Sequence, residues 1–419
     1  MNGGPVALRP LTLVDEADSV IVGDPATGQF IEVPPVGGVV IRALQRGASI
    51  EEAAAEARQS AGVDVDVAEF VETLAGLGFT ETTAGQTPVR TAPVQQSRWL
   101  SGPSPALLRP FFSRPAWICY IAAFCFSGGC LAASSRLRPH SSDLLIFHDY
   151  LASLAAVTAL SFALLTLHES GHWMAARALG LTARFSVDRR LIFFVAETDL
   201  SQLWSVPRRK RYGPLLAGMA VDSCVLAATL AVRLSEPAGW DASPAGRLVR
   251  AVTCVEVLEL CWQALFFLRT DTYAMFVTAT RCGNLWEVQR LLLRRAFGRA
   301  SAADTGRLAE AGQRDIAVGT WFRWVYLTGG IATVGGYTAF MVPTAVSLLG
   351  RLSHDLASGP LQPGFWQAAA TLALAFLSLL LAAAIALLQA TRAHQGATPR
   401  ATRRTWRPRR GYPTGSTGS

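Results

Sequence analysis

Six apolar stretches run through this chain, and each is close to the length needed to cross a lipid bilayer. They cover 116–135, 146–167, 213–232, 249–268, 318–346 and 365–390. The hydrocarbon core of a bilayer is ~30 Å thick and a helix rises ~1.5 Å per residue, so about 20 apolar residues span it. With 51% hydrophobic residues, the chain is also more apolar than ordinary soluble proteins. We therefore expect a polytopic α-helical membrane protein with about six transmembrane helices.

Arginine and lysine are distributed unevenly between the loops, and this sets the expected orientation. Basic clusters stand at 208–211, 281–299 and 400–410, whereas fewer basic residues occur at 136–145, 233–248 and 347–364. Because basic loops stay on the cytoplasmic side, we expect a multi-pass protein of the cytoplasmic (inner) membrane with both termini in the cytoplasm. The N-terminus lacks a basic segment followed by an apolar run, so no signal peptide is expected.

The net charge and the cysteines exclude two other classes of protein. The charge of +8 comes mostly from arginine beside the apolar spans, and no nucleic-acid-binding module is recognisable. Membrane topology, rather than nucleic-acid binding, therefore explains the charge. The seven cysteines include no C-x-x-C pair, so neither a disulfide framework nor a cysteine zinc site is expected. We interpret them as small buried apolar residues.

The first 85 residues differ from the rest and predict a separate soluble domain. Two strand-like runs within 14–33 flank a turn-rich stretch at 24–28, and helical patterns follow at 38–45, 49–59 and 67–77. Ser49 and Asp66 stand where helix caps are expected, each with a Glu three residues later. We predict a small winged-helix-like α+β domain at 1–85, a proline-rich linker at 86–115, the membrane core at 116–392 and a disordered basic tail at 393–419.

The motif His168-Glu169-Ser170-Gly171-His172 continues directly from the second apolar span, which it extends to Gly180. Histidines at i and i+4 share one helix face and can bind one zinc ion, while the Glu between them can act as general base toward water. Ionisable residues inside a span are costly and usually functional. The motif therefore predicts a metal site in the membrane; the alternative is a hydrogen-bonded polar patch at the end of a span.

A zinc ion in such a site needs a third protein ligand, and Asp271, at the end of the fourth span, is the best candidate. Its alternative role is that of an interfacial carboxylate paired with Arg269. Glu256 and Glu259, three residues apart on one helix face, are rival ligands that could instead share a proton or pair with an arginine. Asp222, in the third span, could position the substrate backbone near the metal or serve as a polar partner for a neighbouring helix.

These residues resemble those of site-2-protease-type intramembrane zinc metallopeptidases, and most of all the bacterial branch of peptide zinc metalloproteases. Besides the histidine motif, the resemblance rests on Thr198-Asp199 with Trp204, on Ala217-Gly218 and on Leu268–Tyr273. It covers about 145–300. It implies that His168, His172 and Asp271 bind Zn²⁺ and that Glu169 is the catalytic base.

Two residues depart from the pattern of this family. Thr272 stands where the family usually has Gly after the ligand Asp, and Asp222 stands about where many members carry Asn. The first departure leaves the local backbone at Asp271 in question, and the second leaves substrate positioning in question. Neither removes an expected zinc ligand or the base.

The first domain resembles the PqqD-like peptide-recognition domains of ribosomal peptide maturation, over 44–52 and 67–79. Such domains bind a leader peptide by adding it as a strand beside a helix; the alternative is a scaffold or partner-docking domain. The expected function is an intramembrane zinc metalloendopeptidase that cuts a peptide or a membrane-associated protein, in leader processing or in signalling. The alternative function is a non-catalytic peptide-binding membrane protein that assists peptide export or immunity.

Overall fold

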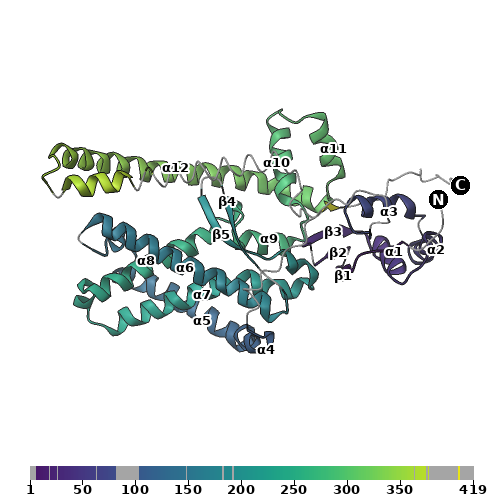
Figure 1. The fold of residues 1–419 in the computed structure, drawn as a ribbon, viewed down its shortest axis with the longest axis horizontal. Coiled ribbons are helices and arrows are strands. Elements are labelled where there is room, and N and C mark those ends of the chain that lie inside the picture. Colours follow the sequence, from purple (N-terminus) through teal and green to yellow (C-terminus); the bar gives the residue numbers. More distant parts are fainter. Residues whose placement is uncertain are drawn as a thin grey trace.

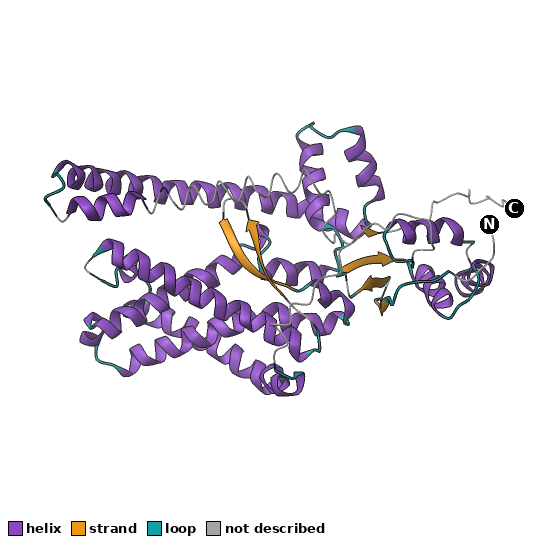
Figure 2. Ribbon diagram, viewed as in Figure 1, coloured by secondary structure: helices purple, strands orange, loops and turns teal. Residues whose placement is uncertain are grey.

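The computed structural model describes residues 6–81, 103–362, 364–373, 376 and 404–405, except for 18, 26, 63, 148, 182–183 and 191–192. The described chain is mostly helical, with a small antiparallel sheet near its N-terminus. Figure 1 shows the N-terminal strands between three short helices and one end of a long helical bundle. Figure 2 shows how little of the molecule is strand. The fold is thus a helical core with an α+β unit at one end.

The N-terminal unit is a three-stranded antiparallel sheet covered by three helices. The elements are β1 (Thr12–Asp15), β2 (Val20–Asp24), β3 (Gln29–Val33), α1 (Pro35–Gln45), α2 (Ile50–Ala61) and α3 (Val67–Gly76). β2 pairs with both neighbours, with Val22 opposite Leu13 on β1 and Ile31 on β3. One face of the sheet and the helices enclose an apolar core that includes Val22, Ile41 and Phe70. This core is separate from the membrane-type helices, so the unit has its own hydrophobic interior.

Local sequence signals placed these helices well but missed one strand. Ser49 and Glu52 form a reciprocal capping box at the start of α2, and the Asp66 side chain accepts from the backbone N–H of Glu69 at the start of α3. The prediction of two strands was wrong, because β1 forms a third. β1 is a four-residue edge strand in which only Val14 is buried, so it lacks a clear apolar alternation.

Four long helices follow in sequence and form the core bundle, in which α7 is central. They are α5 (Arg114–Ala133), α6 (Tyr150–Ala178), α7 (Arg208–Ser235) and α8 (Pro244–Ala264). α7 packs against the other three and against α9. Within the described residues, α5, α7 and the part of α6 over Leu151–Ala178 are long and apolar enough to cross a membrane. These three correspond to the first three expected spans.

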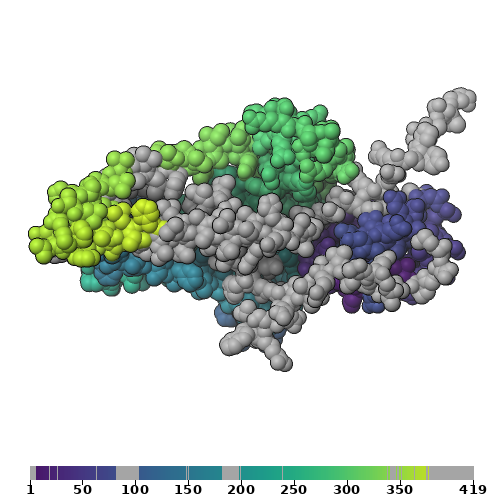
Figure 3. Space-filling view, turned by 45° about the horizontal axis from the view of Figure 1, so that its top comes forward, coloured from purple at the N-terminus to yellow at the C-terminus, as the bar shows by residue number. Residues whose placement is uncertain are grey.

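The other three expected spans stay predictions. α8 covers most of 249–268, but it carries Glu256 and Glu259 together with two arginines. α12 (Gln313–Ala357) contains 318–346 and is much longer than expected. Of 365–390 the structure describes only 365–373 and 376, where a helix runs over 364–373. Figure 3 shows the last part of α12 at the end of the molecule opposite the N-terminal unit.

Large apolar side chains are exposed on the outside of the bundle. They include Ile118, Ile121 and Phe124 on α5, Phe162 on α6 and Ile331 and Val334 on α12. Contiguous exposed apolar surface of this kind is rare on soluble monomers and normal where lipid is the solvent. Among the cysteines, Cys254 and Cys282 are buried, but Cys119, Cys125, Cys224 and Cys261 are exposed. The expectation of burial was therefore wrong for these four cysteines, two of which lie on α5, one on α7 and one on α8.

A β-hairpin that the sequence did not predict lies beside α6. It consists of β4 (Arg184–Arg190) and β5 (Phe193–Asp199), which are antiparallel, with Phe185 opposite Thr198. Of the predicted disordered tail, Arg404–Thr405 is described, and it forms a two-residue strand, β6, parallel to β3. The rest of 393–419 lies outside the described residues, as does most of the linker.

Short elements complete the described chain between these helices. They are α4 (Pro105–Leu108), α9 (Asp271–Thr280), α10 (Leu285–Ala296), α11 (Ala302–Glu310) and the 3-10 helices η2 (Arg109–Phe112), η3 (Ser135–Leu137), η4 (Ser141–Leu144), η5 (Ser201–Ser205), η6 (Ala238–Ala242) and η7 (Phe266–Leu268). α9 packs against α7, and both β1 and β2 contact η5. The N-terminal unit therefore meets the core where the hairpin segment joins α7.

Candidate metal centre

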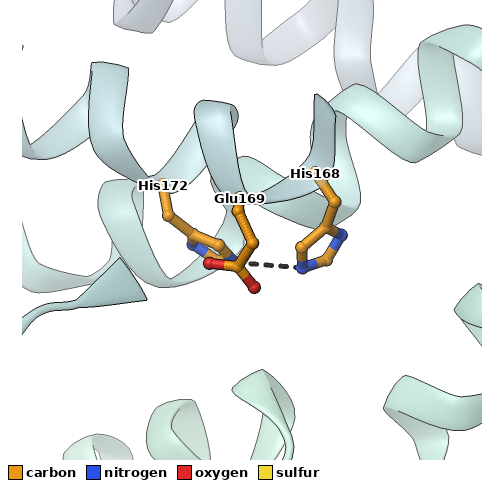
Figure 4. A group of neighbouring side chains, drawn as sticks. All are labelled: His168, Glu169 and His172. Atoms are coloured by element: carbon orange, nitrogen blue, oxygen red, sulfur yellow. Dashed lines mark hydrogen bonds between the residues drawn. The ribbon is translucent and has the colours of Figure 1, made fainter. Parts of the chain in front are cut away.

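The two histidines of the motif lie on one face of α6, one turn apart, and both are buried. Figure 4 shows their rings directed to the same side of the helix, with Glu169 between them. His168 is 4% exposed and His172 is 2% exposed. Their Nε2 atoms are 3.1 Å apart. The i and i+4 spacing thus brings two potential ligand atoms together, as expected for this motif.

The other ring nitrogen of each histidine has an acceptor as its partner. His168 Nδ1 lies 2.7 Å from Asp222 Oδ2, and His172 Nδ1 lies 2.7 Å from the backbone oxygen of Pro214. A carbonyl or carboxylate oxygen can only accept, so each Nδ1 carries the proton. In a neutral imidazole the Nε2 lone pair is then free. Both contacts come from α7, which therefore fixes the tautomer and orientation of both rings.

The Asp271 carboxylate completes a group of three potential ligand atoms. Its Oδ2 lies 3.1 Å from His168 Nε2 and 3.1 Å from His172 Nε2. Two atoms bound to a tetrahedral zinc at ~2.0 Å stand roughly 3.3 Å apart, so the three mutual separations fit one ion. Without a cation, three lone pairs would face one another with no proton to share when both rings are neutral. The donor set of two imidazoles and one carboxylate therefore fits a transition-metal ion.

Asp271 is held in place by Gln263 at the end of α8. The backbone N–H of Asp271 donates to Gln263 Oε1 at 3.1 Å, and Thr270 Oγ1 donates to the backbone oxygen of Gln263 at 3.0 Å. Thr272 Oγ1 also donates to that backbone oxygen. Asp271 is the first residue of α9, where the positive end of the helix dipole favours a carboxylate.

The departure at Thr272 is accommodated by this turn. Thr272 lies in the first turn of α9, so its position does not require glycine. The left-handed backbone occurs earlier, at Arg269, with φ 63°. A non-glycine residue in that conformation costs on the order of 1–3 kcal/mol. The alternative role of Asp271, a pairing with Arg269, is not observed within the described residues; the Arg269 guanidinium instead lies 5.4 Å from the ring centre of Trp286.

Glu169 is positioned by the end of the β-hairpin. Its Oε2 accepts from the backbone N–H of Thr198 at 2.6 Å, and its backbone oxygen accepts from Thr198 Oγ1 at 3.1 Å. One of its carboxylate oxygens also lies within 4.8 Å of ring nitrogens of His168 and His172. Thr198 therefore engages both the side chain and the backbone of Glu169. Glu169 thus stands beside the two histidines, and with them it forms a group of residues that could hold a metal ion.

Two glycines let α6 and α7 approach closely enough to form the site. A Cβ atom on Gly218 would stand 2.4 Å from His168 Nε2 and 2.5 Å from His172 Nε2. One on Gly171 would stand 2.8 Å from the backbone oxygen of Ala217. Small residues allow such close helix contacts inside membranes. Any side chain at 218 would enter the space beside the two Nε2 atoms that a metal ion would need.

A cavity of about 400 Å³ opens onto these residues. Its wall includes His168, Glu169, His172, Asp271 and Glu259, together with apolar side chains such as Leu165 and Trp262. A mostly apolar cavity with a few converging polar groups is the usual form of a small-molecule or peptide site. We name it the catalytic cavity, after the function that is proposed for it below.

The remaining acidic candidates form a second cluster behind His168. Carboxylate oxygens of Asp222, Glu256 and Glu259 lie within 4.8 Å of one another. Asp222 contacts His168 Nδ1 rather than the cavity, so its observed contact is with a potential ligand; substrate positioning by Asp222 stays a prediction. Glu256 is 1% exposed. In this arrangement Glu256 and Glu259 gather around Asp222, and Asp271 is the carboxylate placed at both Nε2 atoms.

The sequence predicted the candidate ligands but not all of the residues that hold them in position. Gln263, the backbone oxygen of Pro214 and the contact of Thr198 with Glu169 were not expected. Gln263 carried one signal, as a polar residue at the end of an apolar span eight residues before Asp271. Comparison of the chain with protein-family models, curated proteins and solved structures found no match.

Proposed function

We propose that this chain is an intramembrane zinc metalloendopeptidase of the site-2-protease type. The observation that carries the proposal is the meeting of His168 Nε2, His172 Nε2 and Asp271 Oδ2 at mutual distances of 3.1 Å. His168, His172 and Asp271 would hold the zinc. When bound there, zinc would polarise the scissile carbonyl and make the attacking water easier to deprotonate.

The remaining steps, proton transfer and the orientation of the ligands, are assigned to residues of this chain. Glu169 Oε1 takes a proton from the attacking water and returns it to the nitrogen of the leaving amine. Thr198 holds the other oxygen of that carboxylate at 2.6 Å, so the base keeps one orientation. Asp222 and the Pro214 carbonyl keep both imidazoles in the tautomer that binds metal. The apolar part of the catalytic cavity limits the number of water molecules around these groups.

The proposal includes the membrane topology and the role of the first unit. We propose that the chain crosses the cytoplasmic (inner) membrane six times and that both of its termini lie in the cytoplasm. The three span-like helices and the exposed apolar side chains support this arrangement. We further propose that the N-terminal α+β unit is a PqqD-like domain that presents a peptide, which would make leader processing the favoured role.

The test combines metal analysis with cleavage of a peptide mixture. The full chain is purified in lipid nanodiscs, its zinc is measured by elemental mass spectrometry, and it is incubated with peptides from a digested proteome. We expect one zinc per chain, lost in His168→Ala, and new peptide termini that are absent with Glu169→Gln. A folded, metal-free wild type, or identical peptide profiles from wild type and Glu169→Gln, would contradict the proposal. The metal-free outcome would favour the non-catalytic peptide-binding protein.

A further inference from the structure

A second cavity lies at the seam between the N-terminal unit and the helical core. It measures about 460 Å³, and we name it the seam cavity. One side is formed by the β1–β2 connection and the end of β3; the other is formed by η5, α9 and the beginnings of α7 and α12. Figure 1 shows these strands and α9 close together at one end of the bundle.

The seam cavity adjoins the catalytic cavity. Four residues line both: Trp204, Arg211, Val277 and Thr278. These four side chains form a wall that the two cavities share. Together the hollows lead from the sheet of the N-terminal unit to His168, Glu169 and Asp271. The two cavities thus adjoin each other between the sheet and the proposed catalytic residues, with Trp204 and Arg211 in the wall that they share.

Specific contacts hold the seam, so the cavity is not a loose gap between two parts. Arg211 is 2% exposed; its Nη2 lies 2.8 Å from Glu16 Oε1, and its guanidinium lies 4.9 Å from the ring centre of Trp204. Trp204 packs with Val14, Ile21 and Phe30, on the sheet face opposite the core of the unit. Gln202 Nε2 donates to the backbone oxygen of Pro25 at 3.0 Å. These contacts fix the sheet relative to the catalytic cavity.

The chemistry of the walls selects between two kinds of substrate. The seam cavity is lined by acidic and basic side chains, among them Glu16, Glu32, Arg208 and Arg281. An apolar transmembrane helix would desolvate these groups without replacing their hydrogen bonds, which is costly. An extended peptide offers a backbone donor and acceptor at each residue except proline and can satisfy them. The walls therefore suit an extended polar segment rather than a helix taken from lipid.

We propose that the seam cavity is the entry site for an extended peptide substrate, which passes over Trp204 and Arg211 into the catalytic cavity. The inference rests on the proposed function and specifies its substrate class. The substrate reaches Glu169 from the side of the N-terminal unit, as a flexible peptide, and not sideways from the bilayer as a helix.

Photocrosslinking tests entry without requiring hydrolysis. p-Benzoylphenylalanine replaces Ala17 or Gln313, which line only the seam cavity, or Gln59 on the exposed face of α2 as control. The full-length Glu169→Gln protein in nanodiscs is then exposed to fluorescein-labelled casein fragments or to a lysine-flanked polyleucine helix in the lipid. We expect casein fragments to label positions 17 and 313 well above position 59. Equal labelling at all three positions, or labelling of 17 and 313 by the polyleucine helix alone, would overturn the proposal.

Filling the cavity gives a second readout. Ala17→Trp is expected to slow cleavage of the casein fragments about tenfold, equivalent to roughly 1.4 kcal/mol, whereas Gln59→Trp leaves the rate unchanged. Zinc content should be the same in both, which shows that each variant is folded. Unchanged cleavage in Ala17→Trp would refute seam entry. If wild type cleaves nothing, the proposed function fails, and the crosslinking result still decides whether peptides enter the seam.

Discussion

A Cβ atom added to Gly218 would stand 2.4 Å from Nε2 of His168, a distance at which a real Cβ atom is essentially never found from another side chain. At Gly218, α7 therefore packs against the two histidine rings with its backbone, because no side chain would fit there. It also supplies Asp222 and the Pro214 carbonyl to the far side of the same rings. The candidate metal centre is consequently built as much by α7, which provides no candidate ligand, as by α6, which provides two.

Replacement of Gly218 by Ala should abolish metal binding while leaving the fold largely intact. The added methyl group would displace both Nε2 atoms, and the far side of each ring is already fixed by α7. Zinc per chain, measured by elemental mass spectrometry, should fall to background. Gly213→Ala, on the same helix and only in ordinary contact with Trp117, serves as control and should keep its zinc. Full zinc occupancy in Gly218→Ala would contradict the proposed position of the ion.

Asp222→Ala should weaken zinc binding by about 10–100-fold, the usual effect of removing the partner that orients a metal-binding histidine. Asp222→Asn should weaken it less, because the amide oxygen still accepts from His168 Nδ1. Competition with a calibrated chelator measures both affinities. Equal affinities for Ala and Asn would show that the contact with His168 has no orienting effect.

Gln263→Leu should weaken zinc binding through the backbone of the third ligand. The variant leaves the Asp271 N–H without its acceptor, and a lost hydrogen bond of this kind costs on the order of 1 kcal/mol. Gln263→Glu retains an acceptor oxygen and should bind zinc more tightly than the Leu variant. Chelator competition again gives the affinities. If Leu and Glu behave alike, the Gln263 side chain does not hold Asp271 in place.

Trp204→Ala should loosen the N-terminal unit from the core without unfolding it. Trp204 packs on Val14, Ile21 and Phe30, whereas the core of the unit lies on the other face of the sheet. Hydrogen exchange measured by mass spectrometry should increase in β1 and η5 but not in α3. Trp204→Phe, which keeps an aromatic ring, should exchange like wild type. Increased exchange throughout the unit would show that it cannot fold without the core.

Acid should lower the stability of the fold by protonating Asp241, which lies in the connection between α7 and α8. Burial works to raise the pKa of Asp241, but hydrogen bonds and charge from Arg136 and Arg233 outweigh it and hold the pKa below its ordinary value. Such a contribution is complete above the unfolded pKa of ~3.9 and disappears as pH falls through the folded pKa. Asp241→Asn should therefore unfold at a lower temperature than wild type at pH 7.

The difference between Asp241→Asn and wild type should shrink below about pH 4, where the carboxylate of the unfolded chain is protonated. Thermal unfolding in nanodiscs across this range measures it. Asp64→Asn, which breaks a highly exposed pair with Arg58, serves as control and should change stability little at any pH. A constant difference between Asp241→Asn and wild type over all pH values would show that the charge of Asp241 is not responsible.

Local sequence patterns predicted the elements that depend mainly on capping residues and on runs of apolar residues. The Ser49 capping box marked the start of α2, and the apolar run of α6 marked a helix that carries the histidine motif. The ends of α12 were missed, because hydropathy marks the apolar middle of a helix and not its termination. The helix runs from Gln313 to Ala357, through polar turns at both ends. The β4–β5 hairpin was not predicted, because the arginines of β4 indicate a charged loop rather than a strand.

The candidate site depends on contacts that no local pattern contains. Asp271 and His172 are 99 residues apart in the chain and 3.1 Å apart in space. The position of Asp271 at the end of the fourth span made it the best candidate for a third ligand, ahead of Glu256 and Glu259, and the resemblance to a family implied the same residue. Gln263 could not be foreseen, because its role depends on the turn after α8. Distance in sequence, rather than weak local signals, is therefore what limited prediction of the site.

The wide separation of the ligands along the chain has a consequence for biosynthesis. A nascent chain that has emerged only through α7 contains both histidines and Glu169 but lacks the third ligand. Under the proposed function it stays hydrolytically silent until α8 has been inserted and the turn at Asp271 has closed against α6. If the proposed function holds, the order of synthesis would keep an unfinished chain from cutting other proteins of the cell.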